Sequence, residues 1–307
     1  MRSNPTDRQG TLHLIPFFEG DWVKHIPRPQ RTAPPTPGEC AVFARRCQAA
    51  FRRTVELIGG RFVVGVHTSP AFRATAWTPV LRDTWLAAAE AGATIALHPH
   101  EEYLWVERRG QVAAHWRRVI SEAIDRLKAI GLRPTAFRSG YGLLSPSMLP
   151  ILETAGLTLD FSPAPGWRRL AGAPGWPGGW TSARWLCSRN PAHLRCGHRR
   201  SKILGIPIGA ARVGSGKRWR YLVNEHCDLP TLQRIWDRLC EDAEGLPGPR
   251  CVNFIWCGYG LDRPGLVDQA LSFLEYVLET GGIIPKPADL PYLFPERGPR
   301  EWRTRRG

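Results

Sequence analysis

The sequence has 307 residues, of which 43% are hydrophobic and 22% are charged, and this balance excludes a disordered chain or a collagen-like repeat. Its net charge of +15 favours an anionic partner, although the sequence contains no nucleic-acid-binding module, which argues against nucleic acid. No apolar run reaches the ~20 residues of a membrane helix and no signal region opens the chain, so we expect a soluble, cytoplasmic protein without a membrane span.

Segments typical of strands and helices alternate along the first half of the chain. Strands are predicted at residues 11–18, 61–68 and 93–100, followed by a strand and turn at residues 134–142. Helices are predicted where apolar residues recur at helical spacing, at residues 39–58, 79–91, 115–130 and 145–155. Ser145 is predicted to be an N-cap, because Pro146 follows it at the first helical position.

The second half contains a long stretch without periodicity. Residues 166–198 are rich in Trp, Gly, Pro and Arg, so we expect a long loop over one end of a sheet. Further strands are predicted at residues 157–162, 203–209 and 251–260, and further helices at residues 229–243 and 265–280. Residues 286–307 form a basic C-terminal tail.

This alternation predicts an α/β fold in which helices cover a mainly parallel sheet. About seven strands in a single domain, residues 11–285, favour closure into a distorted (β/α) barrel. The alternative is an open, doubly wound sheet. It has little support, because no glycine-rich phosphate-binding motif follows the first strand.

Eight cysteines occur without a CxxC pair, which is typical of reduced, buried thiols in a cytosolic protein. A structural zinc site is an alternative for one group of residues, because thiolates and imidazoles are zinc ligands. This group consists of Cys187, His193, Cys196 and His198. Its spacing matches no common zinc module.

Polar residues are concentrated where the predicted strands end. In a parallel sheet these ends form the functional face. The candidates are Glu19 and Asp21 after the first strand, His67 after the second, His98 to Glu102 after the third, Arg138 to Tyr141 after the fourth, and Trp256 to Tyr259 after the last.

His98 and His100 are two residues apart, so on a strand their imidazoles point to the same side. A carboxylate from a neighbouring strand end would complete an open metal site with three ligands. Such a site suits metal-assisted hydrolysis, because the ion needs a vacant position for water and the substrate carbonyl. The alternative is that both histidines only bond to backbone groups of the loop.

The motifs of the central segment resemble those of the polysaccharide deacetylase family, also called the NodB-homology family or carbohydrate esterase family four. The resemblance rests on GATIALHPHEEY at 92–103, FRSGYG at 137–142 and LETAGLTLDFS at 152–162. It extends from about residue 12 to residue 284. It implies a NodB-like barrel and a metal-dependent deacetylase that hydrolyses a non-peptide carbon–nitrogen bond of an N-acylated carbohydrate or glycoconjugate.

The resemblance also implies a divalent metal ion, which we expect to be zinc. His98 matches the first metal histidine of the family, and Glu19 matches the metal carboxylate. The second metal histidine comes four residues after the first, where this chain has Glu102. His100 could replace it from the same loop, so the expected ligands are Glu19, His98, His100 and Glu102.

The resemblance to the family also implies which residues are the catalytic groups. Arg138 and Tyr141 match the turn in which the arginine orients the base and the tyrosine N–H meets the oxyanion. The usual base matches Phe17, and the usual histidine acid matches Cys257. Cys257 could still donate a proton. The candidates to replace the base are Asp21, Glu102 and Asp160.

Aromatic residues are candidates for substrate binding, because sugar faces stack on indole and phenol rings. The chain has 13 tryptophans, some of which could instead pack the loops. The residues expected near the mouth of the barrel are Trp105, Trp256 and Tyr259.

Three other functions stay open at this point. Phe17 and Cys257 are compatible with a catalytically degenerate relative that binds a glycan or a partner protein. A cysteine nucleophile at Cys257 would need His67 or His226 as its base. An amidohydrolase-type barrel is disfavoured, because its metal histidines normally lie near the first strand. The sequence leaves the oligomeric state open.

Overall fold

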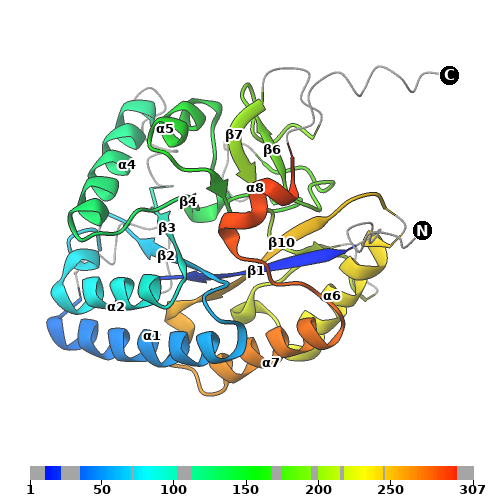
Figure 1. Cartoon of the computed structure of the whole chain (residues 1–307), viewed down its shortest axis with the longest axis horizontal. Coiled ribbons are helices and arrows are strands. Elements are labelled where there is room, and N and C mark those ends of the chain that lie inside the picture. The colour runs from blue at the N-terminus through cyan, green and yellow to red at the C-terminus, as the bar shows by residue number, and fades with distance from the viewer. Residues whose placement is uncertain are drawn as a thin grey trace, which may run out of the picture.

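The computed structural model describes residues 11–21, 35–70, 72–101, 112–167, 175–194, 200–214, 218–244 and 246–295. Its main element is a curled sheet of eight strands in the order β10-β1-β2-β3-β4-β5-β7-β6 (Figure 1). The strands are β1 (Leu12–Glu19), β2 (Val63–His67), β3 (Thr94–His98), β4 (Ala136–Phe137), β5 (Leu159–Asp160), β6 (Arg184–Cys187), β7 (Arg200–Gly205) and β10 (Arg250–Cys257). Neighbouring strands run parallel, except that β6 pairs with β7 in the antiparallel sense.

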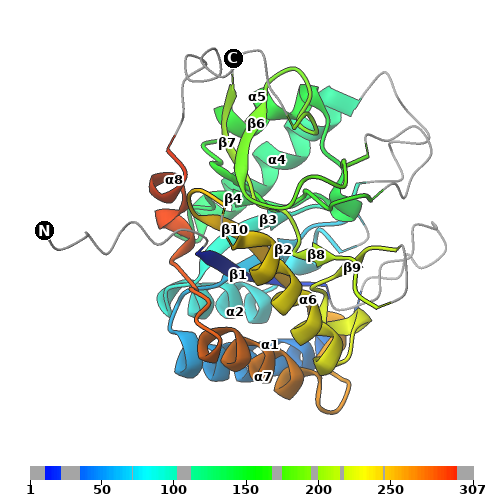
Figure 2. The same cartoon turned by 90° about the vertical axis from the view of Figure 1, so that its right-hand side faces the viewer.

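Helices cover the outer face of this sheet (Figure 1, Figure 2). They are α1 (Pro37–Ile58), α2 (Pro79–Glu90), α4 (Val112–Ala129), α5 (Leu149–Thr154), α6 (Leu229–Ala243) and α7 (Leu266–Glu279). A further short helix, α8 (Leu290–Leu293), lies at one end of the barrel. The strands and long helices that the sequence predicts are present, with ends that differ by a few residues. Ser145 is the N-cap residue of a 3-10 turn, η4 (Pro146–Met148), which Pro146 begins as predicted. The Ser145 side chain makes no cap hydrogen bond, and its hydroxyl lies 2.8 Å from that of Ser147.

The sheet closes into a distorted barrel through the chain that follows β7. Ile208 forms a parallel bridge to Asn253 on the free edge of β10, and Val223 forms another to Ile255. Two backbone bonds of Asn253 hold this seam, from its N–H to Pro207 at 2.7 Å and from Gly209 to its carbonyl at 2.8 Å. The predicted barrel and single domain are therefore confirmed, and the open doubly wound alternative is wrong.

Two apolar cores support the barrel. The larger core lies between the sheet and the helices, and includes Phe18, Trp85 and Trp256. The smaller core fills the inside of the barrel below the strand ends, with Phe17 and Phe161 among its buried residues. Because side chains alternate along a strand, Phe18 faces the helices whereas Phe17 faces the inside, and Glu19 follows Phe17 on the inner side.

Two expectations about residues 166–198 are corrected by the structure. This segment is not all loop, since it contains β6, which adds an antiparallel strand at the edge of the sheet. Cys187 at the end of β6 is disulfide-bonded. It is therefore neither a reduced thiol nor a thiolate that could bind zinc, whereas the free cysteines include Cys47, Cys251 and Cys257.

The folded domain extends beyond residue 285, where the sequence suggested a tail. The 3-10 turn η7 (Pro287–Asp289) leads into α8. Leu290 of α8 is fully buried in the inner core, so α8 closes the barrel at the end opposite to the polar strand ends. In the described part of the chain, no helix combines the length and apolarity that crossing a membrane requires.

Candidate metal centre

The ends of β1, β2 and β3 bring the polar residues of the sequence together. Glu19 stands opposite Gly65, and His67 stands opposite His98. Asp21 follows Glu19 by two residues and therefore lies near the level of His67. Parallel strands all end at the same mouth of the barrel, and the register between them sets which of these side chains lie next to one another.

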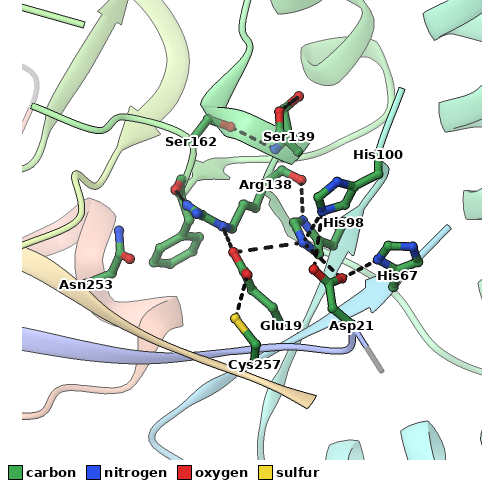
Figure 3. A network of polar contacts seen from close by, with 12 residues as sticks. Glu19, Asp21, His67, His98, His100, Arg138, Ser139, Ser162, Asn253 and Cys257 are labelled. Carbon is green, nitrogen blue, oxygen red and sulfur yellow. Dashed lines mark hydrogen bonds and ion pairs between the residues drawn. The ribbon is translucent and has the colours of Figure 1, made fainter. Parts of the chain in front are cut away.

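Asp21, His67, His98 and His100 form a buried group whose ligand atoms all lie within 4.8 Å of one another. Figure 3 shows the four side chains pointing toward a common centre. Asp21 Oδ1 contacts His67 Nδ1 and lies 3.4 Å from His98 Nε2, and Asp21 Oδ2 lies 3.4 Å from His100 Nε2. The Nε2 atoms of His98 and His100 are 3.0 Å apart.

The orientation of His98 suits a metal ligand. Its Nδ1 lies 3.0 Å from the backbone carbonyl oxygen of Arg138, and only a protonated Nδ1 can donate to that oxygen. Nε2 of the neutral ring then carries a lone pair directed into the group. Metal-bound histidines usually donate their second nitrogen in this way. Together with the buried carboxylate of Asp21, these imidazoles fit a divalent ion such as zinc.

The charges of the group agree with this fit. Burial lowers the pKa of His67 to about 4, more than Asp21 raises it, so His67 is neutral at neutral pH. Burial raises the pKa of Asp21, but the three neighbouring imidazoles outweigh burial and hold that pKa well below its ordinary value. An ionised carboxylate and neutral imidazoles are the forms that bind metals.

Glu19 lies beside this group with different partners. Its Oε1 accepts a hydrogen bond from Arg138 Nε, and its Oε2 accepts one from the Cys257 thiol at 3.0 Å (Figure 3). Burial raises the pKa of Glu19, but Arg138 and His98 outweigh burial and hold it below its ordinary value. Burial and the nearby carboxylates raise the pKa of Cys257 well above its ordinary value, so the thiol keeps its proton.

Phe17 forms the floor beneath these polar groups. Its ring lies 5.7 Å from the guanidinium carbon of Arg138 and 6.3 Å from the ring of His98. A Cβ at Gly65 would stand 2.9 Å from the Phe17 ring, so Gly65 leaves the space that this ring fills. Phe17 therefore lies deeper in the barrel than the polar site. Glu19, two residues further along β1, is the residue whose carboxylate contacts Arg138.

The turn after β4 holds a strained residue at the mouth. Tyr141 has a φ of 51°, the left-handed region that residues other than glycine rarely adopt. A chain of hydrogen bonds supports this turn, since Ser162 Oγ accepts from Ser139 N at 2.9 Å and donates to Asp160 Oδ1 at 2.5 Å. Burial raises the pKa of Asp160 to about 7.

A cavity of about 110 Å³ opens above the metal-ligand group. This volume equals roughly that of three to four water molecules, enough for a small acyl group. The cavity is lined by Glu19, Asp21, His98, His100, Arg138, Tyr141, Trp167, Ile208, Val223, His226, Ile255, Cys257 and Tyr259.

Most residues selected from the sequence thus line one cavity. Trp256 does not, because its side chain faces the outer core and packs edge-on against Phe18 at 5.3 Å. Glu102 and Trp105 lie outside the described residues. Glu19, expected as a ligand, is paired with Arg138, whereas Asp21, expected as a base, joins the histidines.

His67 is the group member that the sequence-based ligand set lacks. The signal for it was present, since His67 ends the strand before the one that carries His98. Trp167, which lines the cavity, comes from a stretch without periodicity.

Comparison with solved structures identifies the fold. One polypeptide from Mycobacterium smegmatis, named as a polysaccharide deacetylase, is 14% identical, with a TM-score of 0.57 over 95% of this chain and 92% of that chain. A second structure of that name, from Pseudomonas aeruginosa PAO1, is 13% identical to this chain, with a TM-score of 0.57. The match covers 95% of this chain and 94% of that chain. The structure of an allantoinase is 13% identical to this chain, with a TM-score of 0.58. The match covers 95% of this chain and 94% of that chain.

At the level of sequence, no protein-family model and no curated protein matches this chain. The structural likeness therefore defines a class of fold. This chain has the NodB-like barrel of the polysaccharide deacetylases, as the resemblance in its motifs implied, with a buried aspartate and histidine group at the strand ends.

Proposed function

We propose that this protein is a metal-dependent deacetylase that hydrolyses the amide of an N-acylated carbohydrate or glycoconjugate. The observation that carries the proposal is the position of the Glu19–Arg138 pair beside the group of Asp21, His67, His98 and His100. The pair and all members of the group except His67 line one small cavity. The names of two structural neighbours, both called polysaccharide deacetylases, support the substrate class.

In this proposal Asp21, His67, His98 and His100 hold one divalent ion, and their nitrogen and carboxylate donors favour zinc. When bound, such an ion supplies a Lewis acid for the substrate carbonyl. This ligand set replaces the set expected from the resemblance, since Glu19 moves from ligand to base.

Glu19 is the general base of the proposed reaction. It takes a proton from the attacking water, whose oxygen forms a bond to the carbonyl carbon. Arg138 keeps the carboxylate ionised and oriented, and Cys257 fixes its second oxygen. The backbone N–H of Tyr141 is the proposed donor to the developing oxyanion, because Tyr141 lines the cavity on the turn after β4.

The carbon–nitrogen bond then breaks, and the leaving amine needs a proton. The best proton donors have a pKa near the working pH, and the raised pKa of Cys257 makes its thiol a poor one. His226 lines the same cavity, and histidine is the side chain that most often transfers protons in enzymes. We therefore assign the proton donor to His226.

The test is a deacetylation assay on chitooligosaccharides and on other acylated amino sugars, with zinc or cobalt added. We expect amine and acetate to be released in equal amounts, and we expect a chelator to stop the release until metal is restored. Binding of these sugars without turnover, under all metal conditions, would favour the degenerate binding protein that Cys257 first suggested.

A further inference from the structure

The wall of the cavity continues into a surface hairpin. Ile208 and Val223 both line the cavity, and between them the chain forms the two-stranded sheet of β8 (Ala210–Ala211) and β9 (Arg220–Tyr221). Figure 2 shows this hairpin beside α6. Whatever occupies the cavity and extends beyond it on this side meets the hairpin.

One face of the hairpin is aromatic. Ala210 stands opposite Tyr221, and Ala211 stands opposite Arg220. Because neighbouring residues of a strand point to opposite faces, Tyr221 and Trp219 share a face with Arg212, whereas Arg220 points to the other face. The register therefore places two aromatic rings and one guanidinium on the same side.

This face joins the cavity through Trp167. The rings of Trp167 and Tyr221 are 5.3 Å apart, and Trp167 lines the cavity. Trp219 packs closely against the backbone of Gly166, the residue before Trp167. A Cβ added to Gly166 would stand only 2.6 Å from the Trp219 indole. Trp167, Tyr221, Trp219 and Arg212 thus form a strip that leads outward from the cavity, which we call the hairpin strip.

Arg212 is the charged end of the hairpin strip. It is exposed, and its guanidinium carbon lies 5.2 Å from the centre of the Trp219 ring. Within the part of the chain that the structure describes, no carboxylate lies within 4.0 Å of this guanidinium. By contrast, Arg53 pairs with Asp268 at 2.8 Å. Arg212 is therefore held in place by stacking while its hydrogen-bond donors stay available.

We propose that the hairpin strip is a binding subsite for an acidic oligosaccharide, with sugar rings on its aromatic residues and a carboxylate or sulfate group on Arg212. Aromatic rings suit sugar faces, and guanidinium binds such anions through paired hydrogen bonds. The excess of positive charge, +15 over the whole chain, attracts an anionic ligand to this surface. The assignment of sugar to the strip rests on the proposed deacetylase function.

The experiment measures binding by calorimetry, with chelator present so that turnover cannot interfere. The probes are tetra-N-acetylchitotetraose, which is neutral, a hyaluronan tetrasaccharide, which carries carboxylates, and a sulfated chitotetraose. We expect at least one anionic probe to bind about five- to tenfold more tightly than the neutral probe, since exposed ion pairs contribute modestly. The advantage falls as salt is added.

Two variants of the full chain assign the effect to the hairpin strip. Arg212→Gln removes the charge but keeps most of the side chain, and we expect it to abolish the preference for the anionic probe while leaving neutral binding unchanged. Arg45→Gln removes an equal charge from the exposed surface of α1 and serves as the matched control. We expect it to change neither affinity.

Equal affinity of the wild-type protein for all three probes would overturn the subsite, as would equal losses in the two variants. The binding result is independent of the deacetylase assay. A preference that depends on Arg212, in a protein without turnover, would retain the subsite and reject the proposed reaction. Turnover without a preference for the anionic probe would support the proposed reaction and reject the subsite.

Discussion

Glu19 and Asp21 show how two acids on one strand end acquire different chemistry from their neighbours. Arg138 and Cys257 surround the first carboxylate, and three imidazoles surround the second. The sequence predicts that both acids belong to the site, because both follow a strand. It cannot say which one meets the histidines, since residues two apart on a strand point to the same side and only the register with the next strand separates their levels.

The first prediction separates the two acids. Glu19→Gln keeps the size of the side chain but removes the base, so we expect kcat/KM to fall by about 10²- to 10⁴-fold while bound metal per chain is unchanged. Glu122→Gln is the control, because Glu122 also pairs with an arginine but lies exposed on α4. Loss of the metal from the Glu19→Gln protein would return Glu19 to the ligand set.

The second prediction concerns Asp160, which is fully buried below the turn that carries Tyr141. Burial raises its pKa from 3.8 to about 7, so the folded state binds its proton more tightly than the unfolded state does. The stability that this proton contributes is complete below about pH 4 and is lost as the pH rises through 7.

Urea unfolding of wild type and Asp160→Asn between pH 4 and pH 8 measures this effect. We expect the free energy of unfolding of wild type, relative to the variant, to fall by about 2 to 4 kcal/mol over that interval. A difference that does not change with pH would show that Asp160 is ionised throughout.

Among the elements, the strands of the barrel follow directly from apolar runs bounded by polar residues. The helices follow from their spacing and ends, as in α1, where Thr36 and Glu39 form a capping box and Gly59 ends the helix. The strand β6 was missed because its four residues lie in a stretch rich in Trp, Gly and Pro, where no alternation is readable. It pairs in the antiparallel sense with β7, the next strand along the chain.

The third prediction tests the packing of β1 against β2. A methyl group at Gly65 would meet the Phe17 ring at 2.9 Å and His98 Cβ at 3.1 Å, so we expect Gly65→Ala to lower stability by about 1 to 3 kcal/mol through overpacking. Gly38→Ala is the control, because the nearest atom to its new Cβ lies 4.0 Å away. Thermal unfolding of both proteins measures the effect, and equal Tm values would show that the inner core adapts freely.

For the whole molecule, the class of fold was predictable because motif order along the chain reflects the order of strands around the barrel. The departures lie in long-range features, namely the disulfide of Cys187, the closure of the barrel by α8, and the contribution of His67 from a neighbouring strand. The disulfide and α8 leave no local pattern in the sequence, whereas His67 does stand at the end of a predicted strand and only its place in the ligand set was missed.

The proposed function depends on cation binding by the buried group at the strand ends. The most direct test is metal analysis of the full chain after equilibration with zinc and removal of free ion. We predict one ion per chain in wild type and in His193→Ala, whose histidine is exposed and belongs neither to the buried group nor to the cavity lining. We predict none in folded Asp21→Ala or His67→Ala. Wild-type protein without metal, or both site variants with a full complement, would contradict this account.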